Sequence, residues 1–314
     1  MLVLGAGRSG TSLTARALQA VGVDLGENFK PASRKNPSGF FEDRALLALS
    51  KKLRRSLGLR PESLRLLSDD IWSSTTVTGF LEPFEKTIRR QFGHSDIWGF
   101  KYARTMRLLP FWMQLFERME IEPNFLMPIR NPLSVARSRA KLDKSRGAQE
   151  HSDLEWLVNV VPYFPLVKSH RLVVVDYDEL LTAPRNELNR IASGLDLDKS
   201  EEQESEISNF SDNFIRSGLR HSRFSDDDLQ SSEFINPLVK SAYPLLSQLA
   251  RDEIDPSNEG LWKTWADIHE QLKALAPILN RMDVLAQQLR YAQFNPLSPV
   301  SAIYNELQKF MAKR

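Results

Sequence analysis

A glycine-rich turn near the start of the chain carries an arginine and several hydroxyl side chains. The turn GAGRSGTS, residues 5–12, follows the apolar run Leu2–Leu4 and precedes a helical pattern. Glycines allow the backbone N–H groups of such a turn to converge, and the start of a helix adds positive potential. With the Arg8 guanidinium, these groups would bind a tetrahedral anion. We expect Thr11 or Ser12 to cap the helix.

Three interpretations of this turn compete. Gly5, Gly7 and Gly10 satisfy the dinucleotide fingerprint, but the second strand and acidic residue needed about 20 residues later are missing. The turn also matches a Walker A loop without its lysine, which disfavours an ordinary kinase or ATPase because that lysine reaches the terminal phosphates. The third interpretation takes Arg8-Ser9-Gly10-Thr11 as a clamp on one tetrahedral anion.

A second arginine and a serine follow another predicted strand. Residues 124–129 form an apolar run that Arg130 closes, and a helix is expected from about residue 133 to 146. Ser134 and Ser138 lie four residues apart on one face of this helix, and an arginine and a serine held in this way can share a second phosphate. The alternative is a solvated basic helix face, made of Arg137, Arg139, Lys141, Lys144 and Arg146.

Both motifs resemble those of sulfotransferases that use 3′-phosphoadenosine 5′-phosphosulfate (PAPS), in the bacterial carbohydrate-type form with an Arg-Ser-Gly-Thr loop. The resemblance covers about residues 1–225 and includes ASRKNPSGFFEDRALLAL, WGFKYARTMRLLPFW, RLVVVDYDELL and NFIRSGLRHSR. Tyr102-Ala103 depart from it, because the family usually has Asp-Pro there. The resemblance implies a 5′-phosphosulfate site of Gly7, Arg8, Ser9, Gly10, Thr11 and Ser12. It also implies a 3′-phosphate site of Arg130 and Ser138, closed by Arg220.

The implied reaction is sulfonate transfer, in which positioning and electrostatics dominate. Arg8 would clamp the reacting group, and Lys101 would contact the sulfonate or the acceptor. A carboxylate or histidine must accept the proton of the acceptor hydroxyl. Glu27 resembles the base glutamate of tyrosylprotein-type enzymes, and Glu42 lies in the same loop region, so both stay open. The resemblance implies PAPS as co-substrate and no metal.

Two other classes of function remain as alternatives. One is a P-loop nucleotide kinase with arginine in place of lysine, which would require Mg²⁺. The other is an inactive nucleotide-binding scaffold, for which the Tyr102-Ala103 departure and the long tail argue. For the enzyme, bacterial relatives imply a sugar hydroxyl of a polysaccharide or glycolipid as acceptor.

The arrangement of apolar runs predicts the elements that carry these residues. Strands are expected at 2–4, 97–101, 125–129 and 172–175, and helical stretches separate them. This alternation is typical of an α/β fold with a parallel sheet flanked by helices, and the resemblance implies the P-loop NTPase-like sulfotransferase version. Ligands in such sheets bind at the carboxyl ends of the strands, where the glycine turn, Lys101 and Arg130 fall.

We expect a sulfotransferase domain over residues 1–235, with a helical insertion at about 43–92. The acidic, serine-rich stretch 199–233 is expected to form solvated loops or a lid. Residues 236–314 form a helical C-terminal region that Pro277 should kink or split. This region either folds back onto the catalytic domain as core or forms a dimerisation arm. The arm is suggested by apolar residues spaced alternately four and three apart, the pattern of a helix that pairs with another helix. They are Leu261, Trp265, Ile268, Leu272, Leu275, Leu279, Met282, Ala286 and Leu289.

The composition sets further limits. With 314 residues, 41% of them hydrophobic, the chain can build one large domain and an appendage. The 42 basic and 40 acidic residues nearly cancel, which does not indicate a nucleic-acid partner. The chain has no cysteine, no apolar run near the ~20 residues of a membrane span and no histidines at metal-ligand spacing. We therefore expect a cytoplasmic protein without a metal site.

Overall fold

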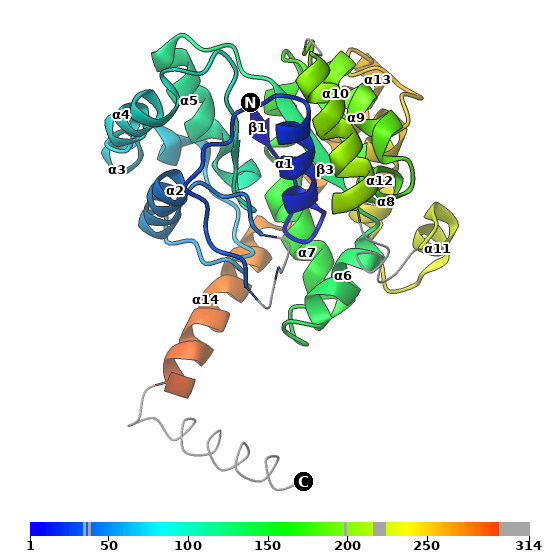
Figure 1. Cartoon of the computed structure of the whole chain (residues 1–314). Helices are drawn as coiled ribbons and strands as arrows, with labels where there is room; N and C mark the ends of the chain where they lie inside the picture. Colours follow the sequence, from blue (N-terminus) through cyan, green and yellow to red (C-terminus); the bar gives the residue numbers. More distant parts are fainter. Residues whose placement is uncertain (34–35, 37–38, 198–199, 216–223, 295–314) are drawn as a thin grey trace, which may run out of the picture.

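Four short parallel strands form the centre of the molecule (Figure 1). The computed structural model describes residues 1–33, 36, 39–197, 200–215 and 224–294. The strands lie in the order β2-β1-β3-β4. Their bounds are Leu2–Val3 (β1), Phe100–Lys101 (β2), Phe125–Ile129 (β3) and Leu172–Asp176 (β4). The predicted α/β fold with a parallel sheet is therefore confirmed.

Helices surround this sheet and connect its strands (Figure 1). The first six are α1 (Thr11–Ala20), α2 (Arg44–Ser56), α3 (Thr75–Thr78), α4 (Leu81–Phe92), α5 (Leu109–Met119) and α6 (Pro132–Ala140). The next four are α7 (Gln149–Val160), α8 (Tyr177–Thr182), α9 (Pro184–Gly194) and α10 (Glu201–Asn209). The last four are α11 (Asp226–Ser231), α12 (Pro237–Ala250), α13 (Glu259–Ala274) and α14 (Ala276–Phe294). Short 3-10 turns are η1 (Asp69–Ser73), η2 (Met106–Leu108) and η3 (Phe164–Val167), and η4 (Phe210–Phe214) is a π-helical turn.

Each face of the sheet packs on its own helices, because successive strand residues point to opposite sides. Leu2, Phe125 and Met127 belong to one core, which α5, α7, α12 and α13 complete. Val3 and Leu126 belong to the other core, which α1, α9 and α10 complete. All four strands point the same way, so the residues at their carboxyl ends meet at one edge of the sheet.

The first helix starts differently from the expectation. Gly10, in a left-handed conformation with φ of 96°, is the N-cap residue, and no side chain caps the helix. The expected cap by Thr11 or Ser12 is therefore wrong. A Cβ atom at Gly10 would overlap the ring of Tyr177, so close packing as well as backbone conformation demands glycine here. The uncapped N–H groups at the start of α1 remain free to bind an anion.

The helix after Arg130 is shorter than predicted. It ends at Ala140 instead of 146, because Asp143 folds the next residues into a turn. The Asp143 carboxylate accepts hydrogen bonds from the backbone N–H groups of Ser145 and Arg146. This turn directs Arg146 back toward α7 instead of leaving it on a solvated helix face.

The described residues of the acidic stretch at 199–233 include two helices, where loops or a lid were expected. These are α10 and α11, and each begins with a capping box, at Ser200 and Ser225. In a capping box the serine and the residue three positions later satisfy each other's backbone N–H groups. Acidic residues in the first turns also interact favourably with the helix dipoles.

The C-terminal region divides between core and projection. As Pro277 predicts, the helical pattern is split, between α13 and α14. Trp265 on α13 is fully buried, lies 4.5 Å from the Phe164 ring and donates a hydrogen bond to the Val161 carbonyl. α12 and α13 share the main core, which corresponds to the first of the two alternatives stated for this region. α14 projects from the body of the molecule (Figure 1). The part of the predicted helical region beyond residue 294 lies outside the described residues.

Candidate functional site

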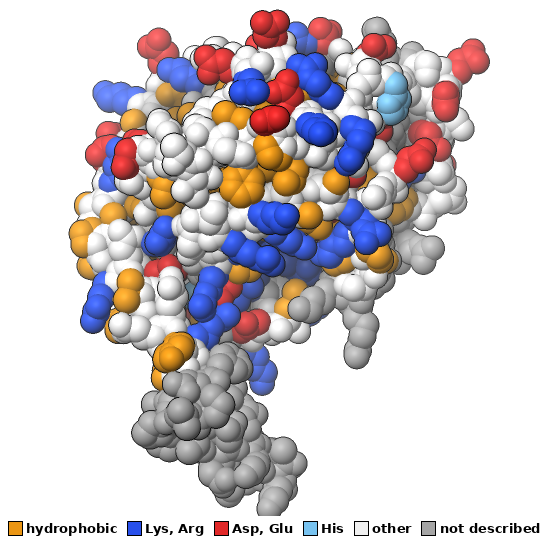
Figure 2. All heavy atoms as spheres, turned by 90° about the vertical axis from the view of Figure 1, so that its left-hand side faces the viewer, with side chains coloured by type: hydrophobic (Ala, Val, Ile, Leu, Met, Phe, Trp, Pro, Cys, Tyr) orange, Lys and Arg blue, Asp and Glu red, His pale blue; other side chains and the backbone are white. Residues whose placement is uncertain are grey.

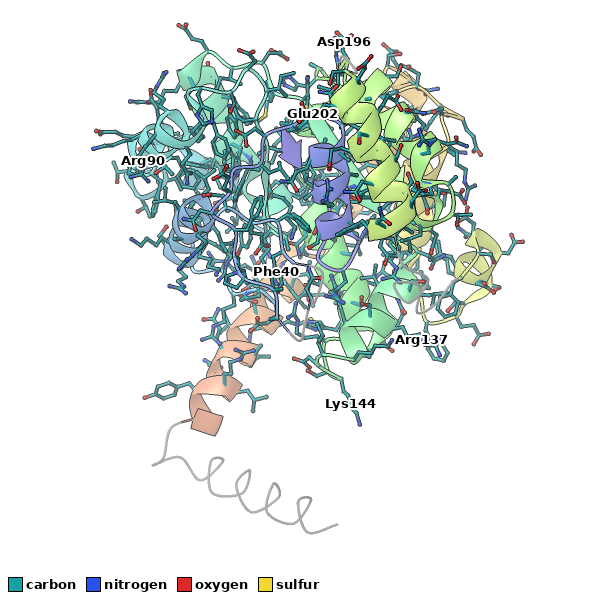
Figure 3. The ribbon with its side chains drawn as sticks, in the orientation of Figure 1. Phe40, Arg90, Arg137, Lys144, Asp196 and Glu202 are labelled. Atoms are coloured by element: carbon teal, nitrogen blue, oxygen red, sulfur yellow. The ribbon has the colours of Figure 1, made fainter. Side chains whose placement is uncertain are left out.

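A cleft of about 570 Å³ lies at the carboxyl ends of the strands. The turn after β1, Lys101 of β2, Arg130 after β3 and Tyr177 after β4 all line it. Phe40 lines it as well, and it lies at the same end of the molecule as Arg137 of α6 (Figure 3). The fold therefore brings the two predicted anion-binding motifs together in one cavity.

The glycine turn forms one wall of the cleft. Of its predicted residues, Gly7, Arg8, Gly10, Thr11 and Ser12 line the cavity. Ser9 does not line the cleft, because it is buried and its hydroxyl donates a hydrogen bond to the Ala6 carbonyl. The backbone N–H of Ser9 donates to the same carbonyl, at 3.2 Å, so Ser9 stabilises the turn.

Arg8 joins the two motifs. Its Nε donates a hydrogen bond of 3.1 Å to the hydroxyl of Ser138 on α6. Desolvation, followed by the positive charge of Arg130, lowers the pKa of Arg8 from its ordinary value. Two guanidinium groups that repel each other across a cleft would be stabilised by an anion between them.

Arg130 is a buried arginine that also lines the cleft. It is 7% exposed, and its guanidinium lies 4.4 Å from the centre of the Tyr177 ring. Its Nε is buried and finds no hydrogen-bond partner among the described residues. A buried donor without a partner is costly, so a bound anion that accepted this hydrogen bond would stabilise the site.

A buried lysine links the turn to the loop that carries Glu42. The Lys101 ammonium donates to the Ser12 hydroxyl at 3.0 Å, to the Phe40 carbonyl at 3.0 Å and to the Glu42 carboxylate at 3.2 Å. Burial lowers the pKa of Lys101, whereas the charge of Glu42 opposes this shift. Lys30 also pairs with Glu42, at 3.5 Å. All three protons of the Lys101 ammonium are thus engaged, and Lys101 holds Glu42 near Ser12.

The two candidate bases differ in their relation to the cleft. Glu27 is exposed and is absent from the cleft lining, whereas Glu42 is buried and lines it. Arg220 lies outside the described residues. Tyr102 and Ala103 both line the cleft.

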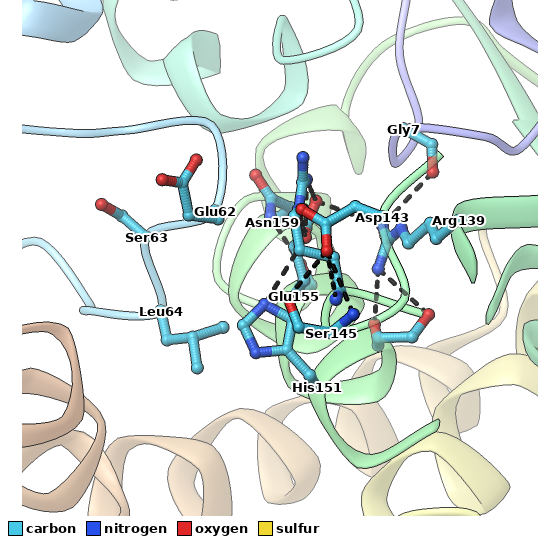
Figure 4. Close-up of polar contacts among 12 residues, drawn as sticks. Gly7, Glu62, Ser63, Leu64, Arg139, Asp143, Ser145, His151, Glu155 and Asn159 are labelled. Atoms are coloured by element: carbon cyan, nitrogen blue, oxygen red, sulfur yellow. Dashed lines mark hydrogen bonds and ion pairs between the residues drawn. The ribbon is translucent and has the colours of Figure 1, made fainter. Parts of the chain in front are cut away.

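Sequence reasoning missed a network behind the glycine turn (Figure 4). Arg139 donates hydrogen bonds to the carbonyls of Ser152 and Gly7 and pairs with Glu155 at 3.4 Å. Arg146 binds the same carboxylate through two nitrogens. Burial lowers the pKa of Arg139 to about 10, so its guanidinium stays charged at neutral pH. The basic residues Arg139 and Arg146 were visible in the helix pattern, but their pairing with the buried Glu155 cannot be recognised from sequence spacing.

The cleft is strongly positive. Its lining contains nine Lys and Arg side chains and three carboxylates, whereas the whole chain has a net charge of +2. The rest of the chain is therefore net negative. On the face drawn in Figure 2, Lys and Arg side chains gather near the lower middle. Such a concentration of positive charge attracts and orients anionic ligands.

Comparisons with known proteins leave the family unassigned. No protein-family model matches the chain, and no curated protein matches it. A solved structure, the sulfotransferase domain from the Synechococcus PCC 7002 olefin synthase, is similar with a TM-score of 0.41. The sequence identity is 16%, over 87% of this chain and 93% of that chain. A similarity this weak carries no argument about activity, so the functional argument rests on the residues of the cleft.

Two further observations apply to the described part of the chain. No helix there is long and apolar enough to cross a membrane. Within the same residues, no group of three or more His, Asp or Glu side chains is placed to hold a metal ion.

Proposed function

We propose that this chain transfers a sulfonate group from PAPS to an acceptor hydroxyl, with a carbohydrate or glycolipid as the acceptor class. One observation carries the proposal, the hydrogen bond between Arg8 and Ser138, whose positions differ by 130 residues. It joins an anion-binding turn at the start of α1 to the Arg130 motif at the start of α6. PAPS has two separate anionic groups, at its 5′ and 3′ positions, and so suits a cleft with two such motifs.

The residues fit this donor. The N–H groups at the start of α1, with Arg8, Thr11 and Ser12, suit the 5′-phosphosulfate. Arg130, whose buried Nε lacks a partner among the described residues, and Ser138 suit the 3′-phosphate. Arg220 is retained for that phosphate only because the segment around it resembles the family.

The reaction forms a bond between the acceptor oxygen and sulfur while the bond from sulfur to the bridging phosphate oxygen breaks. Adenosine 3′,5′-bisphosphate leaves with the bonding electrons. Arg8 would stabilise the charge that develops on the phosphate, but it would not protonate it, because arginine stays charged. The acceptor proton passes to a carboxylate, and we assign this role to Glu42, since it shares the Lys101 ammonium with Ser12.

A binding experiment separates this proposal from the kinase alternative. In EDTA, saturating adenosine 3′,5′-bisphosphate should raise the melting temperature, since a ligand at about 100 times its Kd stabilises by about 2.7 kcal/mol. ATP should give no comparable shift, with or without Mg²⁺. A shift with ATP that requires Mg²⁺, and none with the bisphosphate, would support a kinase and overturn the proposal.

Transfer of ³⁵S-sulfonate from labelled PAPS separates an enzyme from an inactive scaffold. A sulfotransferase should label a carbohydrate or glycolipid in a mixture of cellular acceptors, and heat-denatured protein should not. Binding of the bisphosphate without any labelled product would favour the scaffold.

A further inference from the structure

The cleft extends beyond the donor motifs to three basic side chains, Lys51 and Arg54 of α2 and Arg104 after β2, which we call the basic trio. Lys51 and Arg54 are three residues apart in α2 and therefore share one helix face. All three line the same cavity as Glu42 and Lys101. None of the three belongs to the turn or to the Arg130 motif.

The carboxylates of the cleft are engaged elsewhere. Glu155 pairs with Arg139 and Arg146, and Glu42 pairs with Lys101 and Lys30. The third carboxylate, Asp143, accepts the hydrogen bonds that fold its own turn. Among the described residues, no carboxylate lies within ion-pair distance of the basic trio.

Two members of the basic trio also have unused donors. Arg54 is 8% exposed and donates from Nη1 to the Leu59 carbonyl, but its buried Nε has no partner within the described chain. The buried Nε of Arg104 lacks one as well. A protein tolerates buried guanidinium groups of this kind when a ligand supplies the missing acceptor and charge.

The trio lies in the same cleft as the Glu42–Lys101 pair, next to which the acceptor would react. Burial, followed by the charge of Lys30, lowers the pKa of Lys51, whereas the charge of Glu42 opposes this shift. Burial likewise lowers the pKa of Arg104, and its charge in turn lowers that of Lys101. These couplings mean that the trio lies within electrostatic reach of the Glu42–Lys101 pair.

We propose that the basic trio binds an anionic group on the acceptor, a carboxylate or a phosphate, close to the hydroxyl that receives the sulfonate. This inference rests on the proposed function. The acceptor is then an acidic saccharide or a phosphorylated sugar or lipid headgroup, and not a neutral glycan. Without an anion, an acceptor would leave the trio uncompensated, which disfavours neutral competitors.

The test uses the full chain saturated with adenosine 3′,5′-bisphosphate, so that the donor motifs are already occupied. Calorimetry compares three probes: a tetrasaccharide of alternating hexuronic acid and N-acetylhexosamine, the same tetrasaccharide with its carboxyls reduced to alcohols, and a tetrasaccharide with one 6-phosphate. At low salt, at least one charged probe should bind about tenfold or more tightly than the reduced one. The charged probe with the higher affinity shows whether the trio prefers a carboxylate or a phosphate.

Matched variants assign this preference to the trio. Lys51→Gln and Arg104→Gln should each reduce the preference for the charged probe by about threefold to tenfold. Lys52→Gln is the control, because Lys52 is the exposed neighbour of Lys51 and does not line the cleft. All three variants should keep the affinity of the wild type for adenosine 3′,5′-bisphosphate, which also shows that they fold.

The outcomes separate the two proposals. If the bisphosphate does not bind, the proposed function fails. If it binds but the charged and reduced probes bind equally, or if Lys52→Gln and Lys51→Gln have the same effect, the acidic acceptor is wrong while the sulfotransferase proposal stands.

Discussion

Arg8 is the residue on which the proposed chemistry depends most. Arg8→Ala removes the clamp on the phosphosulfate and should lower turnover by at least about 100-fold. Arg8→Lys should be tolerated only in part, because the planar fork is lost. Since Arg8 already has a φ of 76°, alanine adds no new backbone strain and the fold should survive. The measurement is the rate of sulfonate transfer from PAPS, and near-normal turnover in Arg8→Ala would refute the assignment.

The proposed base is tested by a pair of glutamates. Glu42→Gln should lower turnover by about 100-fold or more while the affinity for adenosine 3′,5′-bisphosphate stays within about threefold, because the carboxylate meets the acceptor and not the donor. The glutamine oxygen can still accept from Lys101, which preserves the loop. Glu27→Gln, at an exposed position outside the cleft lining, is the matched control and should stay active. The reverse result would transfer the role to Glu27.

At the scale of single residues, local sequence motifs predicted many of the residues that line the cleft. They did not predict which side chains pair with one another across the fold. Arg8, Arg130 and Ser138 could be found because glycines, a strand end and a helix start mark their positions in sequence. The contact of Arg146 with Glu155 depends instead on a turn that Asp143 forms and on the packing of α6 against α7. The spacing of residues along the chain therefore cannot predict this contact.

At the scale of elements, a buried carboxylate joins two helices. Asp153 of α7 is fully buried and accepts a hydrogen bond from the backbone N–H of Asn236, the N-cap of α12. Burial raises the pKa of Asp153 to about 6, above its ordinary value of 3.8. The folded state thus binds this proton more tightly than the unfolded state, so this group adds stability as the pH falls through about 6.

Asp153→Asn isolates that contribution. Between about pH 7.5 and about pH 5, the free energy of unfolding of the wild type should rise by about 1 kcal/mol relative to that of the variant. Denaturant unfolding at both pH values measures the difference, and comparison with the variant cancels the titration of all other groups. A difference that stays constant with pH would show that Asp153 does not titrate in this range.

The elements that were predicted well have strong local signals. The strands were placed within a few residues because uninterrupted apolar runs are bounded by turn residues. The helices at 199–233 were missed because their charge and serine content is typical of loops, although capping boxes at Ser200 and Ser225 offered a local sign of helix starts. The early end of α6 was missed because the Asp143 turn competes with continued helix.

At the scale of the whole molecule, α14 presents an apolar stripe that the described part of the chain covers only in part. Ile278, Met282, Leu285 and Leu289 are 41–61% exposed and are spaced four, three and four residues apart. This is the seam spacing of a helix that pairs with another helix. We propose that a second copy of the chain pairs with this stripe, so that the dimerisation arm is confined to α14.

Sedimentation tests this proposal. The full-length protein should be a dimer at micromolar concentration, and Leu285→Glu should convert it to a folded monomer, because a charge in the seam opposes pairing. The melting temperature should change little, since Leu285 is 47% exposed and lies outside the main core. A wild-type monomer at that concentration would exclude the arm.

The sulfotransferase proposal depends on two separate anion-binding motifs, one that binds the 5′-phosphosulfate of PAPS and one that binds its 3′-phosphate. The most direct test compares the binding of adenosine 3′,5′-bisphosphate and adenosine 5′-phosphosulfate, which lacks the 3′-phosphate, by calorimetry. Arg130→Ala and Ser138→Ala should weaken bisphosphate binding by about 10-fold to 100-fold and phosphosulfate binding by less than about threefold. Equal losses for both ligands would contradict the account, because Arg130 and Ser138 would then support the fold without reading the 3′-phosphate.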